Sequence, residues 1–210
     1  MPISLTKGQR VSLEKDTGKS YDRIVMGLGW DARVQPKKGG FLSFLTGGGE
    51  SDIDLDASVG LFDNRGNMVD QVWFRQLRSV DGSVEHTGDN LTGQGDGDDE
   101  QIIVSLTRVP PQVQALVFVV SSYSNDTFDS IDNAFCRMVD ASNGQEILRY
   151  QLTTQGPHTA MIMMTLYRRD TGWSVRAVGE TAQGRTLVDL AEKMRANQPV
   201  ETTLFGQESA

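Results

Sequence analysis

Residues 53–77 read IDLDASVGLFDNRGNMVDQVWFRQL and contain the clearest indication of the fold. Two segments rich in β-branched and aromatic residues, 53–63 and 68–77, flank the sequence Asp63-Asn64-Arg65-Gly66-Asn67. Asn and Gly tolerate the positive φ of a tight turn, so this stretch predicts a β-hairpin. Similar short segments, separated by Gly, Asn and Asp, recur along the chain. The pattern predicts a mainly β protein built as an antiparallel β-sandwich.

Working outward, further strands are predicted at residues 9–15, 23–30, 101–109, 115–123, 134–141, 146–153, 159–169 and 173–179. Near the C-terminus, Leu187, Leu190, Ala191 and Met194 follow the spacing of one face of a helix. Thr186 and Asp189 resemble a capping box before it. We therefore expect one C-terminal amphipathic helix whose apolar stripe packs on the core. Residues 1–197 are predicted to form one domain, and residues 198–210 a polar tail.

The composition restricts the classes of function. The chain has 210 residues and a formal net charge of −8, which argues against a large nucleic-acid footprint and favours cations as partners. Its one cysteine, Cys136, cannot form an intramolecular disulfide, and the first residues lack the apolar stretch of a secretory signal. The longest apolar run, 115–120, is too short to span a bilayer. We predict a cytoplasmic protein whose membrane role, if it has one, is peripheral at the inner face.

Residues 35–50 differ in composition from the rest. Lys37 and Lys38 precede an apolar cluster that begins at Phe41 and ends at Leu45, and glycines stand on both sides. The glycines predict a mobile insertion. Two interpretations remain open: the cluster anchors the protein to a membrane or a partner, or it folds back as a lid. Five residues provide too little apolar area for stable membrane binding alone.

Aspartates at positions 52, 54 and 56 alternate with Ile53, Leu55 and Ala57. On an extended strand, the three carboxylates therefore share one face. They lie about 7 Å apart and repel one another, more strongly where water is excluded. A divalent cation would remove that repulsion.

The segment 88–100, GDNLTGQGDGDDE, is the most acidic in the chain. It contains five acids and no Lys or Arg, and its glycines let the backbone turn so that carboxylates and the Asn90 amide oxygen converge. Calcium takes six to eight such oxygen ligands, whereas zinc and copper prefer the His and Cys that this segment lacks. The spacing does not fit an EF-hand, and no Lys completes a phosphate-binding loop. The alternative is a solvated acidic loop that keeps the protein soluble.

Several motifs resemble the TerD/TerZ-type tellurium-resistance and stress proteins of bacteria. They are Gly27-Leu28-Gly29-Trp30-Asp31, Ile53-Asp54-Leu55-Asp56-Ala57-Ser58, the segment 86–100, Ala134-Phe135-Cys136-Arg137, Leu166-Tyr167-Arg168 and Ala177-Val178-Gly179. The resemblance implies a β-sandwich with two calcium ions at one edge, and a role in resistance to tellurite, phage and certain colicins. Carried over by position, the implied ligands are Asp31, Asp54, Asp56, Asp89, Asn90, Asp96, Asp98, Asp99 and Glu100.

Three functional hypotheses follow. The first is a non-catalytic, calcium-binding interaction or signalling module that acts with protein partners of a stress-resistance complex. The second is a metal-assisted hydrolase, for which His86 is the one nearby base of the usual type. The third is a calcium-dependent peripheral membrane adaptor that uses the cluster from Phe41 to Leu45. Cys136 is expected to be a small buried hydrophobe, which disfavours detoxification of tellurite by a thiol.

Overall fold

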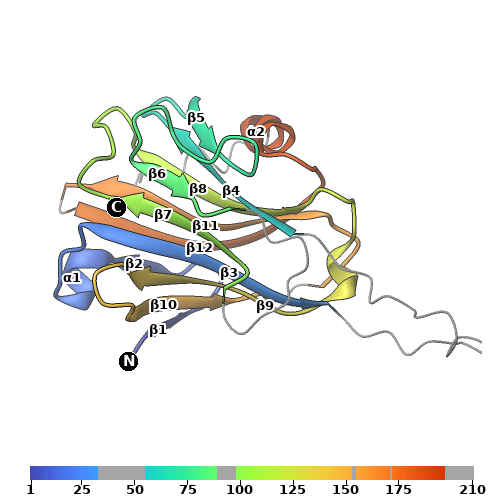
Figure 1. Cartoon of the computed structure of the whole chain (residues 1–210), viewed down its shortest axis with the longest axis horizontal. Coiled ribbons are helices and arrows are strands. Elements are labelled where there is room, and N and C mark those ends of the chain that lie inside the picture. The colour runs from blue at the N-terminus through green and yellow to red at the C-terminus, as the bar shows by residue number, and fades with distance from the viewer. Residues whose placement is uncertain (33–54, 89–97, 153–154, 171, 197–210) are drawn as a thin grey trace, which may run out of the picture.

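The computed structural model describes residues 1–32, 55–88, 98–152, 155–170 and 172–196. Two six-stranded sheets pack face to face as a sandwich, which confirms the predicted fold class (Figure 1). Sheet A has the order β1 (Ile3–Leu5), β10 (Glu146–Gln151), β9 (Ile131–Asp140), β3 (Arg23–Ala32), β7 (Glu100–Ser105) and β6 (Val84–His86). Sheet B has the order β2 (Arg10–Ser12), β12 (Gly172–Ala182), β11 (Ala160–Arg169), β8 (Ala115–Ser122), β4 (Leu55–Phe62) and β5 (Met68–Val72).

The core follows from the alternation of side chains along the strands. In β4, Leu55, Val59 and Leu61 are fully buried in the cluster between the sheets, where they meet residues such as Ile24 and Met138 of sheet A. The predicted burial of Cys136 is confirmed, since its side chain is 2% exposed. Apolar contacts thus hold the two sheets together along most of the sandwich, and buried polar side chains between the sheets are exceptions.

The hairpin predicted from residues 63–67 is confirmed. Asp63 Oδ1 accepts hydrogen bonds from the amides of Arg65 and Asn67, each at 2.8 Å, and Gly66 adopts φ 75°. Asp63 N donates to Asn67 O at 2.9 Å, which closes the turn between β4 and β5. A local signal of Asp, Asn and Gly was sufficient here because the whole turn lies within five consecutive residues.

The C-terminal helix is also confirmed, as α2 (Leu187–Ala196). Thr186 N donates to Asp189 Oδ2 at 3.1 Å and Asp189 N donates to Thr186 Oγ1 at 3.4 Å, the reciprocal bonds of a capping box. Leu187 and Leu190 are 1% exposed and pack against Phe62 and other apolar residues on the outer face of sheet B (Figure 1).

Several predictions about elements were wrong or incomplete. The strand expected at 101–109, for example, ends at Ser105. The strand expected at residues 9–15 ends at Ser12, because the Ser12 hydroxyl accepts a bond from Lys15 N and begins the short helix α1 (Leu13–Thr17). The strand expected at 68–77 ends at Val72, where Trp73 and Gln76 pair across a tight turn. Strand β1 was not predicted, and its pairing with β10 is parallel, so the sandwich is not purely antiparallel.

Two predicted segments cannot be compared with the structure. The predicted insertion at 35–50 and the predicted tail at 198–210 lie outside the described residues. Among the residues that are described, no helix is both long and apolar enough to cross a membrane.

Candidate metal centre

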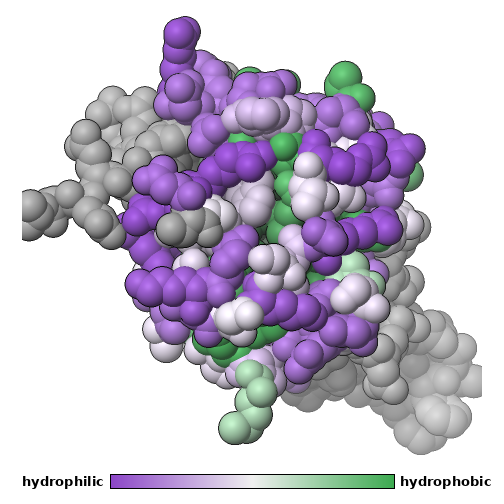
Figure 2. Space-filling view, turned by 90° about the vertical axis from the view of Figure 1, so that its left-hand side faces the viewer, coloured by the Kyte–Doolittle hydropathy of each residue, from purple (hydrophilic) through white to green (hydrophobic). Residues whose placement is uncertain are grey.

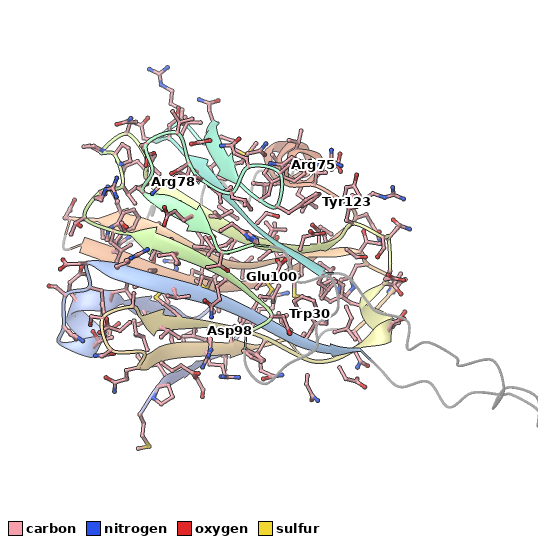
Figure 3. All side chains as sticks on the ribbon, viewed as in Figure 1. Trp30, Arg75, Arg78, Asp98, Glu100 and Tyr123 are labelled. Atoms are coloured by element: carbon pink, nitrogen blue, oxygen red, sulfur yellow. The ribbon has the colours of Figure 1, made fainter. Side chains whose placement is uncertain are left out.

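The segments that carry the predicted ligands meet at one end of the sandwich. Strand β3 ends there, β4 begins there, and the acidic segment 88–100 connects the end of β6 to the start of β7. Figure 3 shows Trp30, Asp98 and Glu100 together in this part of the molecule. The opposite end of the sandwich is mostly hydrophilic (Figure 2). We call the predicted ligands that are described at this end the acidic edge: Asp31, Asp56, Asp98, Asp99 and Glu100.

Glu100 connects the two sheets. It is the first residue of β7 in sheet A, is 1% exposed, and its Oε2 accepts a hydrogen bond from Ala57 N of β4 in sheet B. The pairing of β5 with β4 begins at Val59, so a side chain from the other sheet serves the Ala57 amide instead of a neighbouring strand. A buried carboxylate with a charge-assisted bond to a buried amide fixes the distance between the sheets at this point.

His86 completes this contact. Its Nε2 lies 3.2 Å from Ala57 O and 3.5 Å from Glu100 Oε2, and its side chain is fully buried. Gly88 N donates to His86 Nδ1 at 3.1 Å, so Nδ1 must be unprotonated and the neutral ring carries its proton on Nε2. Both ring nitrogens are therefore engaged, and His86 offers no free nitrogen for a metal or a substrate.

Asp99 attaches the end of the acidic segment to β3. Its Oδ2 accepts a hydrogen bond from Trp30 N at 2.9 Å, and its own amide donates to Leu28 O at 2.8 Å. Trp30 directly precedes Asp31, another predicted ligand. The two bonds place the backbone of Asp99 beside the backbone that carries Asp31.

Asp98 is held in an ion pair that sequence reasoning missed. Arg137 Nε lies 2.7 Å from Asp98 Oδ1 and Arg137 Nη2 lies 3.1 Å from Oδ2, while Gln101 Nε2 donates to Oδ2 at 3.1 Å. This bidentate bond raises the pKa of the Arg137 guanidinium. Gly27 makes the arrangement possible, since a Cβ at that position would overlap the Asp98 carboxylate. The three bonds occupy three of the roughly four lone-pair sites of the Asp98 carboxylate, which leaves about one for a metal ion.

The remaining predicted ligands are placed to different degrees. Asp56 is 4% exposed in β4 and directly precedes Ala57. The backbone of Asp31 lies opposite Asp132 of β9, an acid that the sequence did not suggest because 101 positions separate the two. Asp54, Asp89, Asn90 and Asp96 lie outside the described residues. Within the described ranges, no three His, Cys, Asp or Glu side chains are arranged to hold a metal ion.

The donor chemistry nevertheless fits a hard cation. The side chains that the structure brings to this end are the carboxylates of Asp56, Asp98, Asp99 and Glu100, and the backbone of Asp31 follows Trp30, which is bonded to Asp99. Oxygen donors of this kind suit calcium. Zinc and copper would need nitrogen or sulfur, and the His86 nitrogens are already bonded within the protein.

Comparison with known proteins agrees with the fold and the motifs. The TerD domain matches residues 1–194. The tellurium resistance protein TerZ of Serratia marcescens is 46% identical over 188 residues, covering 90% of this chain and 94% of that protein. The stress response protein SCP2 of Bacillus subtilis is 44% identical, covering 92% and 99%. The crystal structure of a TerD homologue from Streptomyces coelicolor shares the fold with a TM-score of 0.63 at 21% identity, covering 80% of this chain and 95% of that one. The chain belongs to the TerD domain family.

Proposed function

We propose that this chain is a calcium-binding, non-catalytic protein of tellurite resistance and stress response, and that it acts as an interaction or signalling module. The observation that carries the proposal is the convergence of the predicted ligand segments at one end of the sandwich. Asp99 is bonded to β3 beside Asp31, and Glu100 is bonded to β4 beside Asp56. The fold therefore brings the end of β3, the start of β4 and the end of the acidic segment 88–100 together, although they are far apart in sequence.

Electrostatics supports a bound cation. Asp56 and Glu100 are both nearly inaccessible to water, and the bond from the Ala57 amide offsets only part of the cost of burying the Glu100 carboxylate. Their mutual repulsion is stronger in a shielded site than in water. Two calcium ions, held by Asp31, Asp54, Asp56, Asp89, Asn90, Asp96, Asp99 and Glu100 with Asp98 at the margin, would neutralise this charge. When bound, calcium would supply structural order and positive charge rather than chemistry.

The non-catalytic part of the proposal is supported by two side chains. His86, the candidate base of the alternative hydrolase, is buried and has both ring nitrogens engaged. Burial also raises the pKa of the Cys136 thiol, which keeps it protonated and unreactive at neutral pH. Neither group is positioned as a nucleophile or a general base. The names of the relatives refer to tellurium resistance and stress response, and they support that part of the proposal alone. The cytoplasmic location and the protein partners are further parts of the proposal.

Calorimetry and thermal unfolding test the proposal. Calcium added to chelator-treated protein should give binding heat with a stoichiometry of two, and should raise the melting temperature. The expected stabilisation is about 2.7 kcal/mol for each bound ion at a free calcium concentration 100 times the dissociation constant. Asp99→Asn and Glu100→Gln should each weaken binding strongly, because an amide oxygen still accepts the Trp30 or Ala57 bond while the ligand charge is lost.

The control is Asp22→Asn, which removes one exposed carboxylate just before β3, at the other end of that strand. It should bind calcium like the unaltered protein. The proposal would be abandoned if calcium gave neither heat nor thermal stabilisation, or if all three variants behaved alike.

A further inference from the structure

Four side chains form a group at the edge of sheet B, in which Arg75 and Tyr123 are exposed and Trp73 and Phe74 are half-buried. Trp73, Phe74 and Arg75 lie in the turn after β5, and Tyr123 directly follows β8. The Arg75 guanidinium carbon lies 5.6 Å from the ring centre of Trp73, 5.3 Å from that of Phe74 and 5.4 Å from that of Tyr123. Arg75 Nη2 also donates to the Tyr123 hydroxyl at 2.7 Å. We call these residues the aromatic–arginine cluster; Figure 3 shows Arg75 and Tyr123 side by side.

The turn that presents the cluster is held by several hydrogen bonds. Trp73 N donates to Gln76 O at 3.1 Å and Gln76 N donates to Trp73 O at 2.9 Å, so Phe74 and Arg75 stand at the tip of a tight hairpin. Asp70 of β5 also holds the connection between β5 and β6, because its carboxylate accepts hydrogen bonds from Gln76 Nε2 at 2.9 Å and from Val80 N at 2.8 Å. A surface already fixed in shape loses little conformational entropy when it binds.

Arg75 has hydrogen-bonding capacity to spare. A guanidinium has five N–H donors, and the described bond to Tyr123 uses one of them. Within the described part of the chain, no carboxylate lies within ion-pair distance of Arg75, although Arg78 in the same connection pairs with Glu85. A planar guanidinium held between aromatic rings is well suited to bind a carboxylate through two parallel bonds.

Two apolar side chains further along the same connection are exposed. Leu77 is 45% exposed and Val80, at the next turn of the same connection, is 93% exposed. Tyr123 itself is 38% exposed. Arg, Trp and Tyr are the residues that contribute most to binding at protein interfaces, where surrounding contacts of little energy exclude water from them. The composition is that of a protein interface rather than of a solvated loop.

We propose that the aromatic–arginine cluster is a docking surface for an acidic segment of another protein. An aspartate or glutamate of that segment pairs with Arg75, and its apolar neighbours pack on Trp73, Phe74 and Tyr123. The inference names a surface for the interaction module and so rests on that part of the proposed function. Calcium binding is not required for it. A nucleic-acid partner is disfavoured, since a net charge of −8 and one unpaired cluster arginine cannot match a phosphate backbone.

The position of the cluster relates it to the acidic edge. Strands β5 and β8 are the two neighbours of β4 in sheet B. The contact between Arg75 and Tyr123 therefore spans β4 near its first residues, since Ser122 pairs with Leu55. A partner bound to the cluster would lie next to the strand that contains Asp56.

The test uses nuclear magnetic resonance on the full chain with a defined probe, an eight-residue peptide of alternating glutamate and leucine with blocked ends. The peptide should shift the signals of residues 73–77 and 123, and the Trp73 indole N–H, in a saturable way that weakens with added salt. Arg75→Gln should lower the affinity about tenfold. The matched control Arg65→Gln, at an exposed arginine in the hairpin at the opposite end, should leave the affinity unchanged.

Several results would overturn the proposal. They are equal binding of a lysine–leucine peptide, unchanged affinity in Arg75→Gln, or stronger binding of a single-stranded oligonucleotide than of the acidic peptide. Concentration-dependent dimerisation that Arg75→Gln abolishes would assign the surface to a second copy of this chain instead. Each titration is run with calcium and with chelator, and calcium heat is measured on the same samples. A failure of calcium binding is thereby distinguished from a failure of the docking surface.

Discussion

Gly27 is the residue whose substitution has the most specific expected consequence. A Cβ at this position would overlap the Asp98 carboxylate, which Arg137 holds above the strand. Gly27→Ala should therefore displace Asp98, break the ion pair and lower the free energy of unfolding by about 1–3 kcal/mol, the usual cost of overpacking. Urea unfolding in the presence of chelator measures the effect without any contribution from calcium.

A double variant checks this interpretation. In Gly27→Ala/Asp98→Ala the overlap is absent, so the two substitutions should cost less together than the sum of their separate costs. Simple additivity would show that Gly27 acts through the backbone of β3 and not through Asp98.

His158 is predicted to make stability depend on pH. Its ring is 6% exposed and stacks on Phe128 with centroids 4.6 Å apart, and its buried Nε2 has no hydrogen-bond partner. Burial lowers the pKa of the imidazole. The unfolded chain, with an ordinary pKa of about 6.5, therefore binds a proton at a higher pH than the folded protein does. Stability should be complete above pH 6.5 and fall as the pH drops below it.

Urea unfolding at intervals from pH 8 to pH 5 measures this loss. His158→Phe keeps a ring against Phe128 but cannot take up a proton, so its stability should fall less over that range. A second loss at lower pH should be common to both proteins, because Lys19 and Ser142 hold the pKa of Asp140 at about 2. Identical curves between pH 8 and pH 5 would exclude His158 as the cause.

At the scale of elements, β12 contains a bend that only glycine fits. Gly179 has φ 63°, lies at the irregularity where the register between β11 and β12 shifts, and would overlap Tyr150 Oη if it had a Cβ. Gly179→Ala should thus combine two costs, about 1–2 kcal/mol for the positive φ and about 1–3 kcal/mol for the overlap. Gly8→Ala is the matched control, since Gly8 has φ 83° and open space around it.

Thermal unfolding of both variants separates the two costs. Gly8→Ala should show the first cost alone, and Tyr150→Phe should recover part of the second in the Gly179→Ala background. Equal destabilisation by Gly179→Ala and Gly8→Ala would mean that Tyr150 moves aside freely.

Elements defined by neighbouring residues were the ones that the sequence could predict. The hairpin at 63–67 and the capped helix α2 depend on contacts within four positions, and both were found where expected. Helix α1 was missed because its five residues are too few to show a helical period, and Ser12 acts both as strand residue and as N-cap. The parallel partner of β1 lies more than 140 positions away, beyond any local pattern.

The same distinction applies to the candidate site. The types and spacing of the acids predicted hard-oxygen ligands, since that inference needs no tertiary information. They could not show that Asp98 pairs with Arg137, 39 positions away, or that Glu100 and His86 both bond Ala57. The difference between a carboxylate available to a metal and one engaged by an arginine is set by strand pairing, which composition does not reveal.

At the scale of the whole molecule, carboxylates connect the strands at one end of the sandwich. Glu100 bonds the Ala57 amide across the two sheets, and Asp99 bonds the Trp30 amide within sheet A. If calcium binds these carboxylates, opening of that end must also break metal contacts. Stabilisation should therefore be local to this end and not spread evenly along the strands.

Native-state hydrogen exchange tests this directly. With free calcium at 100 times its dissociation constant, the amides of Ala57 and Trp30 should exchange about 100-fold more slowly than in chelator for each ion that the opening releases. The Asn67 amide is the internal control, since it too donates to a carboxylate, that of Asp63, but in the hairpin at the opposite end. Equal slowing at all three amides would indicate that calcium stabilises the protein only against global unfolding. Unchanged exchange at Ala57 and Trp30 would show that calcium does not bind to the carboxylates of Asp99 and Glu100. Slowing confined to Ala57 and Trp30 would locate the ions at the end of the sandwich where the acidic segment begins and ends.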